Sequence, residues 1–349
     1  MSRRVPIPVP ALGLLVLASA LAAPVPGAQD PTPKPTPPPV EQPAGGTKPA
    51  PPGAGAQPAE VLLGSDGAPL APGRIPANTD AAAKSAWDAL LAATLGAAAE
   101  RKPVTSFSLE IDVVVKEKNQ AGGQYDYLAP GWVRARLDKT KNVSMRGPDG
   151  DFFYDPDKHV AQKIEVTRET ESDRRQLDDM LAIARNFVAL TDPKSLRIAR
   201  LARMSAPPPV VGPDHALRAK ELVWLDVESP DFRLVRTTTP GDRPALYRVQ
   251  LGLDAKTSLP VQALVHEAGG KASVTPNTLF LELADWRLYD GTRVPKQVKT
   301  YEVDERSLAA GAGDATKLRF QLDPTSDVVI TKAQINPPLT ADAFRPPKK

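Results

Sequence analysis

Residues 147–162, GPDGDFFYDPDKHVAQ, hold four aspartates and a histidine, side chains that could bind a metal ion. A calcium loop of the EF-hand type needs oxygen ligands at alternate positions, a glycine at the sixth and a glutamate at the twelfth. Counted from Asp149 or Asp151, neither residue falls in place. The stretch instead fits two tight turns, PDG at 148–150 and DPD at 155–157, around a short aromatic strand. We therefore expect turns here and no metal site.

Other patterns for catalysis are also missing from the sequence. The chain has no cysteine, so a thiol nucleophile and a thiolate-bound metal are excluded. Its three histidines, at positions 159, 215 and 266, are far apart. No G-x-S-x-G elbow, Walker loop or dinucleotide fingerprint occurs. We expect no catalytic residue and no cofactor; a hydrolase is the weaker alternative, and it would need a histidine beside Ser or Asp in the core.

Composition and the first residues indicate export. With Lys+Arg 44 and Asp+Glu 41, the net charge of +3 does not suggest nucleic acid as a partner. A short basic segment at residues 2–4, an apolar run at 11–23 and small residues after it predict a signal peptide over residues 1–28. No cysteine follows it that could carry a lipid anchor. We expect a periplasmic or otherwise exported protein.

Residues 29–78 are rich in proline and poor in residues that could form a core. Proline fixes its own backbone angle and donates no hydrogen bond, so this segment is predicted to be a disordered tether. A proline-motif ligand for a partner is the alternative. The folded domain is predicted to cover residues 79–349.

The rest of the chain reads as a helix followed by about a dozen strands. A helix is expected to start at a capping Thr79 or Asp80 and to end before Pro103. Alternation of apolar and polar residues then predicts strands with one buried face. These strands are expected near residues 107–115, 133–137, 151–155, 159–166, 221–227, 232–238, 246–252, 261–265, 278–288, 297–304, 318–322 and 328–335. Short turns between them favour an antiparallel sheet or barrel.

Residues 172–204 interrupt the strands and are predicted to be two helices joined at TDPKS. The first carries an apolar stripe that includes Leu177, Leu181 and Phe187. Such a pair either plugs the end of the β core or acts as a lid over a cavity. The basic segment SLRIARLAR (residues 195–203) could contact anionic lipid, although a solvated helix face also explains it.

The order of segments resembles the bacterial outer-membrane lipoprotein carrier family (LolA- and LolB-like). The motifs are PGWVR at 130–134, DGDFFYDPDKHV at 149–160, LGLDAKTSLPVQALVHE at 251–267 and LADWRLYDGTRVPKQVKTYE at 283–302, with INPPLTADAFRPP at the end. The resemblance implies an α+β fold, a half-open antiparallel β-barrel with an N-terminal helix and a helical lid. It also implies that Arg134 holds the lid closed.

From this resemblance we expect a non-enzymatic carrier, a monomer that binds the acyl chains of a lipid or lipoprotein in an apolar cavity. The expected ligand-binding residues are Arg134, Trp132, Phe107, Leu109, Ile111, Phe152, Tyr154, Leu177, Leu181 and Phe187. The alternative is an envelope sensor or interaction module of the same fold, with an envelope membrane protein as its partner.

Overall fold

The computed structural model describes residues 61–95, 103–115, 118–139, 141–165, 171–208, 220–232, 246–267, 278–304, 307 and 319–347. The chain divides into two compact units, and residues 62–349 belong to the first of them. The predicted signal peptide and the tether up to residue 60 lie outside the described residues. So do His215 and most of the strand predicted near residues 232–238.

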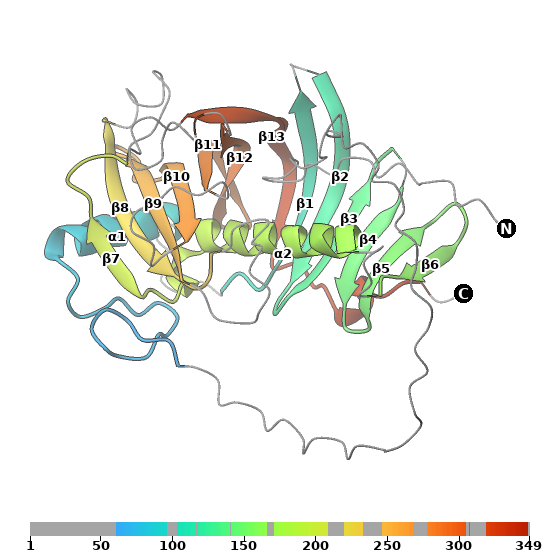
Figure 1. Cartoon of the computed structure of the whole chain (residues 1–349), viewed down its shortest axis with the longest axis horizontal. Helices are drawn as coiled ribbons and strands as arrows, with labels where there is room; N and C mark the ends of the chain where they lie inside the picture. Colours follow the sequence, from blue (N-terminus) through green and yellow to red (C-terminus); the bar gives the residue numbers. More distant parts are fainter. Residues whose placement is uncertain are drawn as a thin grey trace, which may run out of the picture. The chain divides into compact units, whose positions relative to one another are not determined.

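The described residues form a 13-stranded antiparallel sheet that remains open. Its order is β6-β5-β4-β3-β2-β1-β13-β12-β11-β10-β9-β8-β7, so two meanders are joined where β1 pairs with β13 (Figure 1). The strands are β1 (Ser106–Val115), β2 (Lys118–Leu128), β3 (Trp132–Leu137), β4 (Val143–Gly147), β5 (Gly150–Asp155), β6 (Val160–Lys163), β7 (Arg200–Arg203), β8 (Leu222–Ser229), β9 (Tyr247–Asp254), β10 (Pro260–Glu267), β11 (Leu279–Tyr289), β12 (Thr292–Val303) and β13 (Phe320–Ile335). The edge strands β6 and β7 each have one neighbour in this order.

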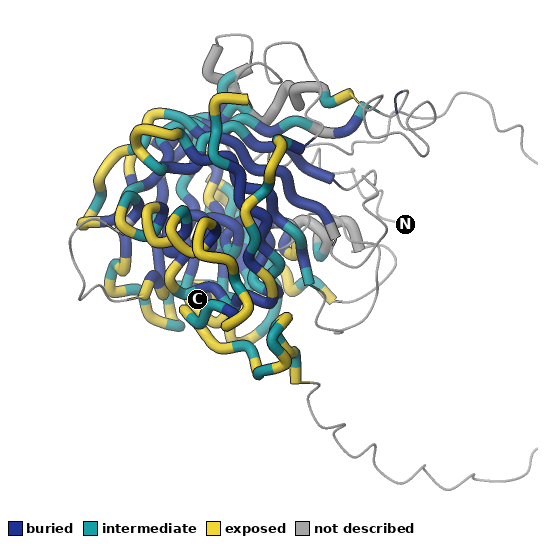
Figure 2. Tube along the Cα trace, turned by 90° about the vertical axis from the view of Figure 1, so that its left-hand side faces the viewer, coloured by how far each residue is buried: buried dark blue, intermediate teal, exposed yellow. Residues whose placement is uncertain are grey.

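Alternation along the strands gives the sheet two faces, because successive side chains point to opposite sides. We call the face of Phe107, Leu109 and Ile111 the inner face. Residues directly opposite in an antiparallel pair share a face, so the register extends the inner face through Tyr125 and Val133 across β2 and β3. Most of the apolar core lies on this face. Figure 2 shows buried residues running along the strands, with exposed residues at the connections and on one side of the helix over residues 81–95.

Helix α1 (Ala81–Leu95) packs against β7, β8 and β12. The Ala83 N–H donates to Asp80 Oδ1 at 2.7 Å, so Asp80 caps the helix as the sequence indicated. Trp87 and Leu90 are buried in the inner-face core. None of the helices among the described residues is long and apolar enough to cross a membrane.

Residues 62–78, which the sequence analysis assigned to the tether, hydrogen-bond to the folded unit. Ser65 N–H donates to the Ala199 carbonyl at 2.7 Å and Gly73 N–H to the Leu196 carbonyl at 2.9 Å. The carboxylate of Asp66 bonds Arg74 and the Ala77 N–H. The folded unit therefore begins at residue 62 and not at residue 79, seventeen residues earlier than expected, because these backbone bonds need no apolar side chains that a sequence pattern could reveal.

Helix α2 (Glu171–Thr191) crosses the sheet (Figure 1). The second helix predicted after it is wrong. The chain forms a short 3-10 turn, η1 (Pro193–Ser195), and then the edge strand β7, which pairs with β8. In β7 the buried Leu201 stands between exposed Arg200 and Arg203. This alternation is typical of a strand, but its apolar residues also fit helical spacing.

The aspartate-rich stretch forms turns, as predicted. Residues 148–149 join β4 to β5, and residues 156–159 join β5 to β6. Asp155 Oδ1 accepts the N–H groups of Asp157 and Lys158 at 3.1 and 3.2 Å. Asp149 pairs with Arg345 at 3.0 Å. No group of three or more His, Asp or Glu side chains that could hold a metal ion occurs among the described residues.

Candidate ligand-binding site

Helix α2 and the inner face of the sheet together make the candidate site. Phe107 lies at its centre, with ring centroids 5.3 Å from Tyr127, 5.8 Å from Tyr125 and 4.7 Å from Phe187 of α2. All four rings are buried. The tyrosines come from β2, which the sequence analysis missed because Gly122, Gly123 and polar residues dilute its apolar alternation. In the described structure, side chains fill the space between α2 and the sheet.

The structure divides the residues that the sequence predicted as ligand-binding between the two faces. Six of them belong to the inner-face core, to which α2 contributes: Phe107, Leu109, Ile111, Leu177, Leu181 and Phe187. The other four lie on the outer face: Trp132, Arg134, Phe152 and Tyr154. The register shows this, since Arg134 is opposite Asp126 and Met145, and Met145 is opposite Phe152.

The hydrogen bonds of Arg134 in the described structure are made to Asp126 and to the C-terminal segment, and not to α2. Its Nε and Nη2 donate to Asp126 Oδ2 at 2.8 and 2.6 Å, and its Nη1 donates to the Ala343 carbonyl at 2.9 Å. The guanidinium also lies 6.0 Å from the centroid of Phe344. Arg134 therefore fixes the C-terminal 3-10 turn η3 (Ala341–Phe344) to the outer face.

Arg146 on β4 is the arginine that reaches α2 from the inner face. Its Nε and Nη2 donate to the two oxygens of Asp151, both at 2.8 Å, and its Nη1 donates to Asp178 Oδ1 at 2.7 Å. The hydrogen bonds to Asp151 first, and then those to Asp178, raise the pKa of Arg146. A sequence signal existed, because a tight turn at residues 147–150 places Arg146 opposite Asp151 across the hairpin.

The two halves of α2 are held differently. The N-terminal half has Leu177 and Met180 buried, while Asp178 is exposed. In the C-terminal half nearly every residue from Ala182 to Thr191 is buried, with Arg185 and Val188 partly so. Asp192, just after the helix, accepts the Val104 N–H at 3.0 Å in the core. The C-terminal half is therefore a core helix, whereas the described side chains of the N-terminal half include both buried and exposed ones.

A pocket of about 290 Å³ opens beside the C-terminal half of α2. Its lining includes Tyr127, Arg185, Val188, Arg197 and Asp231. Burial raises the pKa of the Tyr127 hydroxyl, and the charge of Arg185 acts in the opposite direction. A second hollow of about 180 Å³ lies between α1 and strands β8 and β9.

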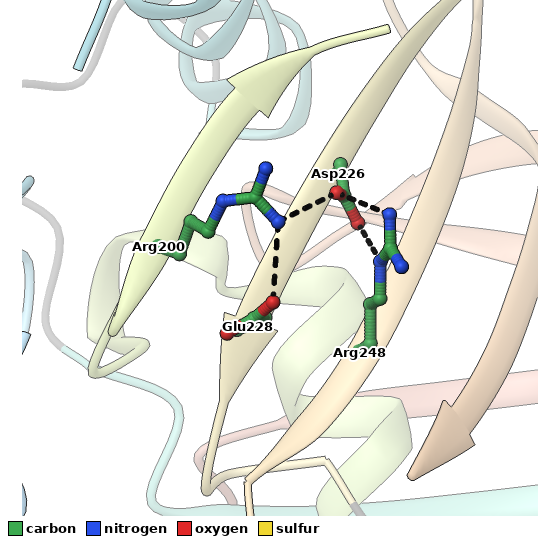
Figure 3. Close-up of polar contacts among 4 residues, drawn as sticks. All are labelled: Arg200, Asp226, Glu228 and Arg248. Atoms are coloured by element: carbon green, nitrogen blue, oxygen red, sulfur yellow. Dashed lines mark hydrogen bonds and ion pairs between the residues drawn. The ribbon is translucent and has the colours of Figure 1, made fainter. Parts of the chain in front are cut away.

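The outer face carries a charged cluster on β7, β8 and β9 (Figure 3). Arg248 donates to both oxygens of the buried Asp226 at 2.6 and 2.7 Å. Arg200 Nη1 lies 3.3 Å from Asp226 and 3.3 Å from Glu228. Two cations thus balance two carboxylates, so this cluster links neighbouring strands and leaves no net charge for a ligand.

Comparisons with known proteins find a likeness in structure only. No protein-family model matches the chain, and no curated protein matches it. The chain is similar to a solved outer membrane lipoprotein-sorting protein domain from Vibrio parahaemolyticus, at 8% identity and a TM-score of 0.35, covering 74% of this chain and 94% of that one. It is also similar to a LolA superfamily protein from Nitrosomonas europaea (11%, TM-score 0.36, covering 75% and 97%) and to a DUF1329 family protein from Desulfovibrio piger (11%, 0.34, 75% and 97%).

These solved structures include the group that the sequence motifs resemble. Identities and TM-scores this low say nothing about a shared ligand or partner.

Proposed function

We propose that the chain is a non-enzymatic, exported carrier that binds an acyl chain between α2 and the inner face of the sheet. The observation that carries the proposal is the unequal anchoring of α2. The described contacts of its N-terminal half with the apolar, aromatic inner face are made by Leu177, Met180 and the partly buried Leu181, and the Tyr125 hydroxyl donates to the Met180 carbonyl. The C-terminal half is buried along nearly its whole length. An acyl chain could take the place of the N-terminal half, which we call the cover, without unfolding the protein.

The cost of opening the cover can be set against the cost of removing the whole helix. Leu177 and Met180 are the large apolar anchors of the N-terminal half, at 1% and 2% exposure. Each contributes about 1.5–3 kcal/mol by burial, so these two side chains hold this half by about 3–6 kcal/mol. The partly buried Leu181 and the hydrogen bond from the Tyr125 hydroxyl to the Met180 carbonyl add to this. The ion pair between Arg146 and Asp178 adds at most about 1 kcal/mol, because Asp178 is 46% exposed.

The whole helix is far harder to displace. Ile183, Phe187 and Leu190 are also buried, which brings the total to about 8–15 kcal/mol. That equals the stability of a typical domain, about 5–15 kcal/mol, so release of all of α2 would amount to unfolding. Opening is therefore confined to the part of the helix before Ala182.

A bound acyl chain would offset the cost of opening. Each buried methylene contributes about 0.8 kcal/mol, so roughly four to eight methylenes balance the loss of Leu177 and Met180 from the inner face. A longer chain then gains net affinity. The lipid would be held by the same rings that now contact α2, and its release would need only closure of the helix.

The first test is native mass spectrometry, with lipid extraction, on the full chain purified from its own exported compartment. Bound lipid is the expected result. A protein that is free of lipid, and remains so after incubation with monopalmitoylglycerol, would refute the proposal.

A variant tests the cover directly. Asp178→Asn removes the ion pair to Arg146, and Asp88→Asn on α1 is a matched control that removes the exposed pair to Lys84. We expect Asp178→Asn to speed the uptake of monopalmitoylglycerol by up to about fivefold, the equivalent of about 1 kcal/mol. Asp88→Asn should leave the rate unchanged. Equal effects of the two variants would contradict the role given to α2.

A second candidate is an envelope interaction module, favoured by the edge strand β6. All four of its residues are exposed, and Val160 is 48% exposed. An unpaired sheet edge can accept a strand from a partner. Ala161→Pro would block such pairing: the Ile164 N–H donates to β5, so by alternation the N–H of residue 161 points to the free edge. If this change abolished binding of an envelope protein while no lipid bound to the unaltered chain, the interaction module would replace the carrier.

A further inference from the structure

The pocket beside α2 contains an arginine without a polar partner. Among the described residues, Arg185 makes no hydrogen bond and no ion pair, although it is partly buried. Its guanidinium lies over the turn between β2 and β3, where Nη2 would be 3.8 Å from a side chain at Gly131. Solvent reaches its guanidinium, so an anion that entered the pocket would meet an accessible cation.

The other charges of the pocket do not supply that partner. Asp231 is the carboxylate in the lining, and Arg197 already occupies it. Asp231 Oδ2 accepts the Arg197 N–H at 2.7 Å, and Oδ1 accepts Nε at 2.9 Å and Nη2 at 2.5 Å. The pair is neutral, which leaves the charge of Arg185 in excess.

One hydroxyl group adds a donor to the pocket, because the Ser195 hydroxyl already donates to the Asp192 carbonyl at 2.8 Å. Tyr127 and Ser195 both line it with Arg185. Tyr127 makes no hydrogen bond among the described residues, and because burial raises the pKa of its hydroxyl, this group stays a donor at neutral pH. The remaining lining is apolar, with Val188 and Leu196 among its members. The pocket thus offers a cation and one neutral donor, the Tyr127 hydroxyl, at the border of the inner-face core.

We propose that this pocket binds a phosphate-type anionic group, with Arg185 as its anchor. On the proposed function, that group is the head of the bound lipid. Tyr127 stacks on Phe107, so an anion at Arg185 lies next to the aromatic surface beneath α2. The same chemistry would also admit free inorganic phosphate, and the experiment below separates these sources.

The test compares lysophosphatidic acid with monopalmitoylglycerol. The two lipids carry the same acyl group and differ only by a phosphate group. Each is titrated into the full-length protein at low salt. Charge-assisted hydrogen bonds to Arg185 should make the phosphate lipid bind about 10- to 100-fold tighter. Arg185→Gln should reduce that ratio to near one without changing the affinity for monopalmitoylglycerol. Arg185→Lys should keep part of the preference, because it keeps the charge but loses the planar fork.

Arg136→Gln on the outer face is the matched control, since it removes an exposed arginine away from the pocket. It should leave the ratio unchanged. If unaltered protein binds both lipids equally, or if Arg185→Gln keeps the preference, the anion site is refuted while the carrier function stands.

If neither lipid binds, the proposed function fails. The melting temperature with added inorganic phosphate then tests whether the pocket binds a free anion. A rise in melting temperature with phosphate that Arg185→Gln abolishes would establish a site for the free anion. No rise, or a rise that persists in Arg185→Gln, would overturn the inference.

Discussion

Leu177 and Leu190 allow the two halves of α2 to be perturbed by the same chemical change. Both are buried, at 1% and 8% exposure, and each can be shortened to alanine. Such truncations remove about 2–3 kcal/mol where the surroundings relax around the cavity. If the N-terminal half opens alone, Leu177 leaves the core in the open state and Leu190 does not.

The two variants should therefore differ in native-state hydrogen exchange. Leu177→Ala lowers the cost of opening the N-terminal half, so the helical amides near residues 175–181 should exchange about 30- to 100-fold faster. Leu190→Ala destabilises the folded and the partly opened forms alike, relative to the unfolded chain. It should leave exchange at these amides unchanged while it lowers the melting temperature of the protein.

Separate opening of the N-terminal half would be refuted by one pattern of amide exchange. If Leu190→Ala accelerates exchange at residues 175–181 as much as Leu177→Ala does, α2 opens as a single unit. Its release would then cost as much as unfolding, and the proposed way of admitting an acyl chain would be lost.

Three further changes test other parts of the structure. Arg134→Leu leaves Asp126, whose side chain is 2% exposed, without its cation, so stability should fall by about 3 kcal/mol in urea titration and the C-terminal turn should become sensitive to protease, while lipid binding persists. Asp66 has its pKa lowered from 3.8 to about 2, first by the Ala77 N–H and also by Arg74. Its stabilising effect is thus present above pH 3.8 and lost as the pH falls towards 2; amide exchange at residues 62–78 should rise over that range, and Asp66→Asn should abolish the pH dependence. Gln262 is fully buried with both amide atoms unpaired, so Gln262→Met should raise the melting temperature; a lower value would show that the amide has a role in stability.

Much of the sheet could be predicted from the sequence because strands with one buried face alternate clearly. Phe107, Leu109 and Ile111 show this in β1, and the turn residues around β5 mark its limits. The alternation does not predict β2, because glycine and polar residues take the places of apolar ones there. The backbone of β2 still pairs with its neighbours. It was ambiguous in β7, where Leu201 fits helical and strand spacing equally well.

The candidate site was harder to predict because alternation does not say which face of a strand receives the helix. Arg134 and Arg146 both stand near aromatic residues in the sequence, and both end in ion pairs with aspartate. Only the register from β2 to β5 puts Arg146 on the side of α2 and Arg134 on the side of the C-terminal turn. A shift of one residue would exchange their roles, so the sequence could predict an arginine contact but not which arginine makes it.

The unequal anchoring of α2 also orders the steps of binding. Arg185, Val188 and the aromatic ring of Phe187 belong to the half that stays in the core, so the pocket for the anionic group would persist when the N-terminal half opens. Leu181, four residues before Arg185, packs near the same turn at Gly131. A lipid could therefore bind by its head first, at a site already formed, and its acyl chain would then compete with Leu177 and Met180 for the inner face. The head group would select the lipid, and the length of its chain would decide whether the cover stays open.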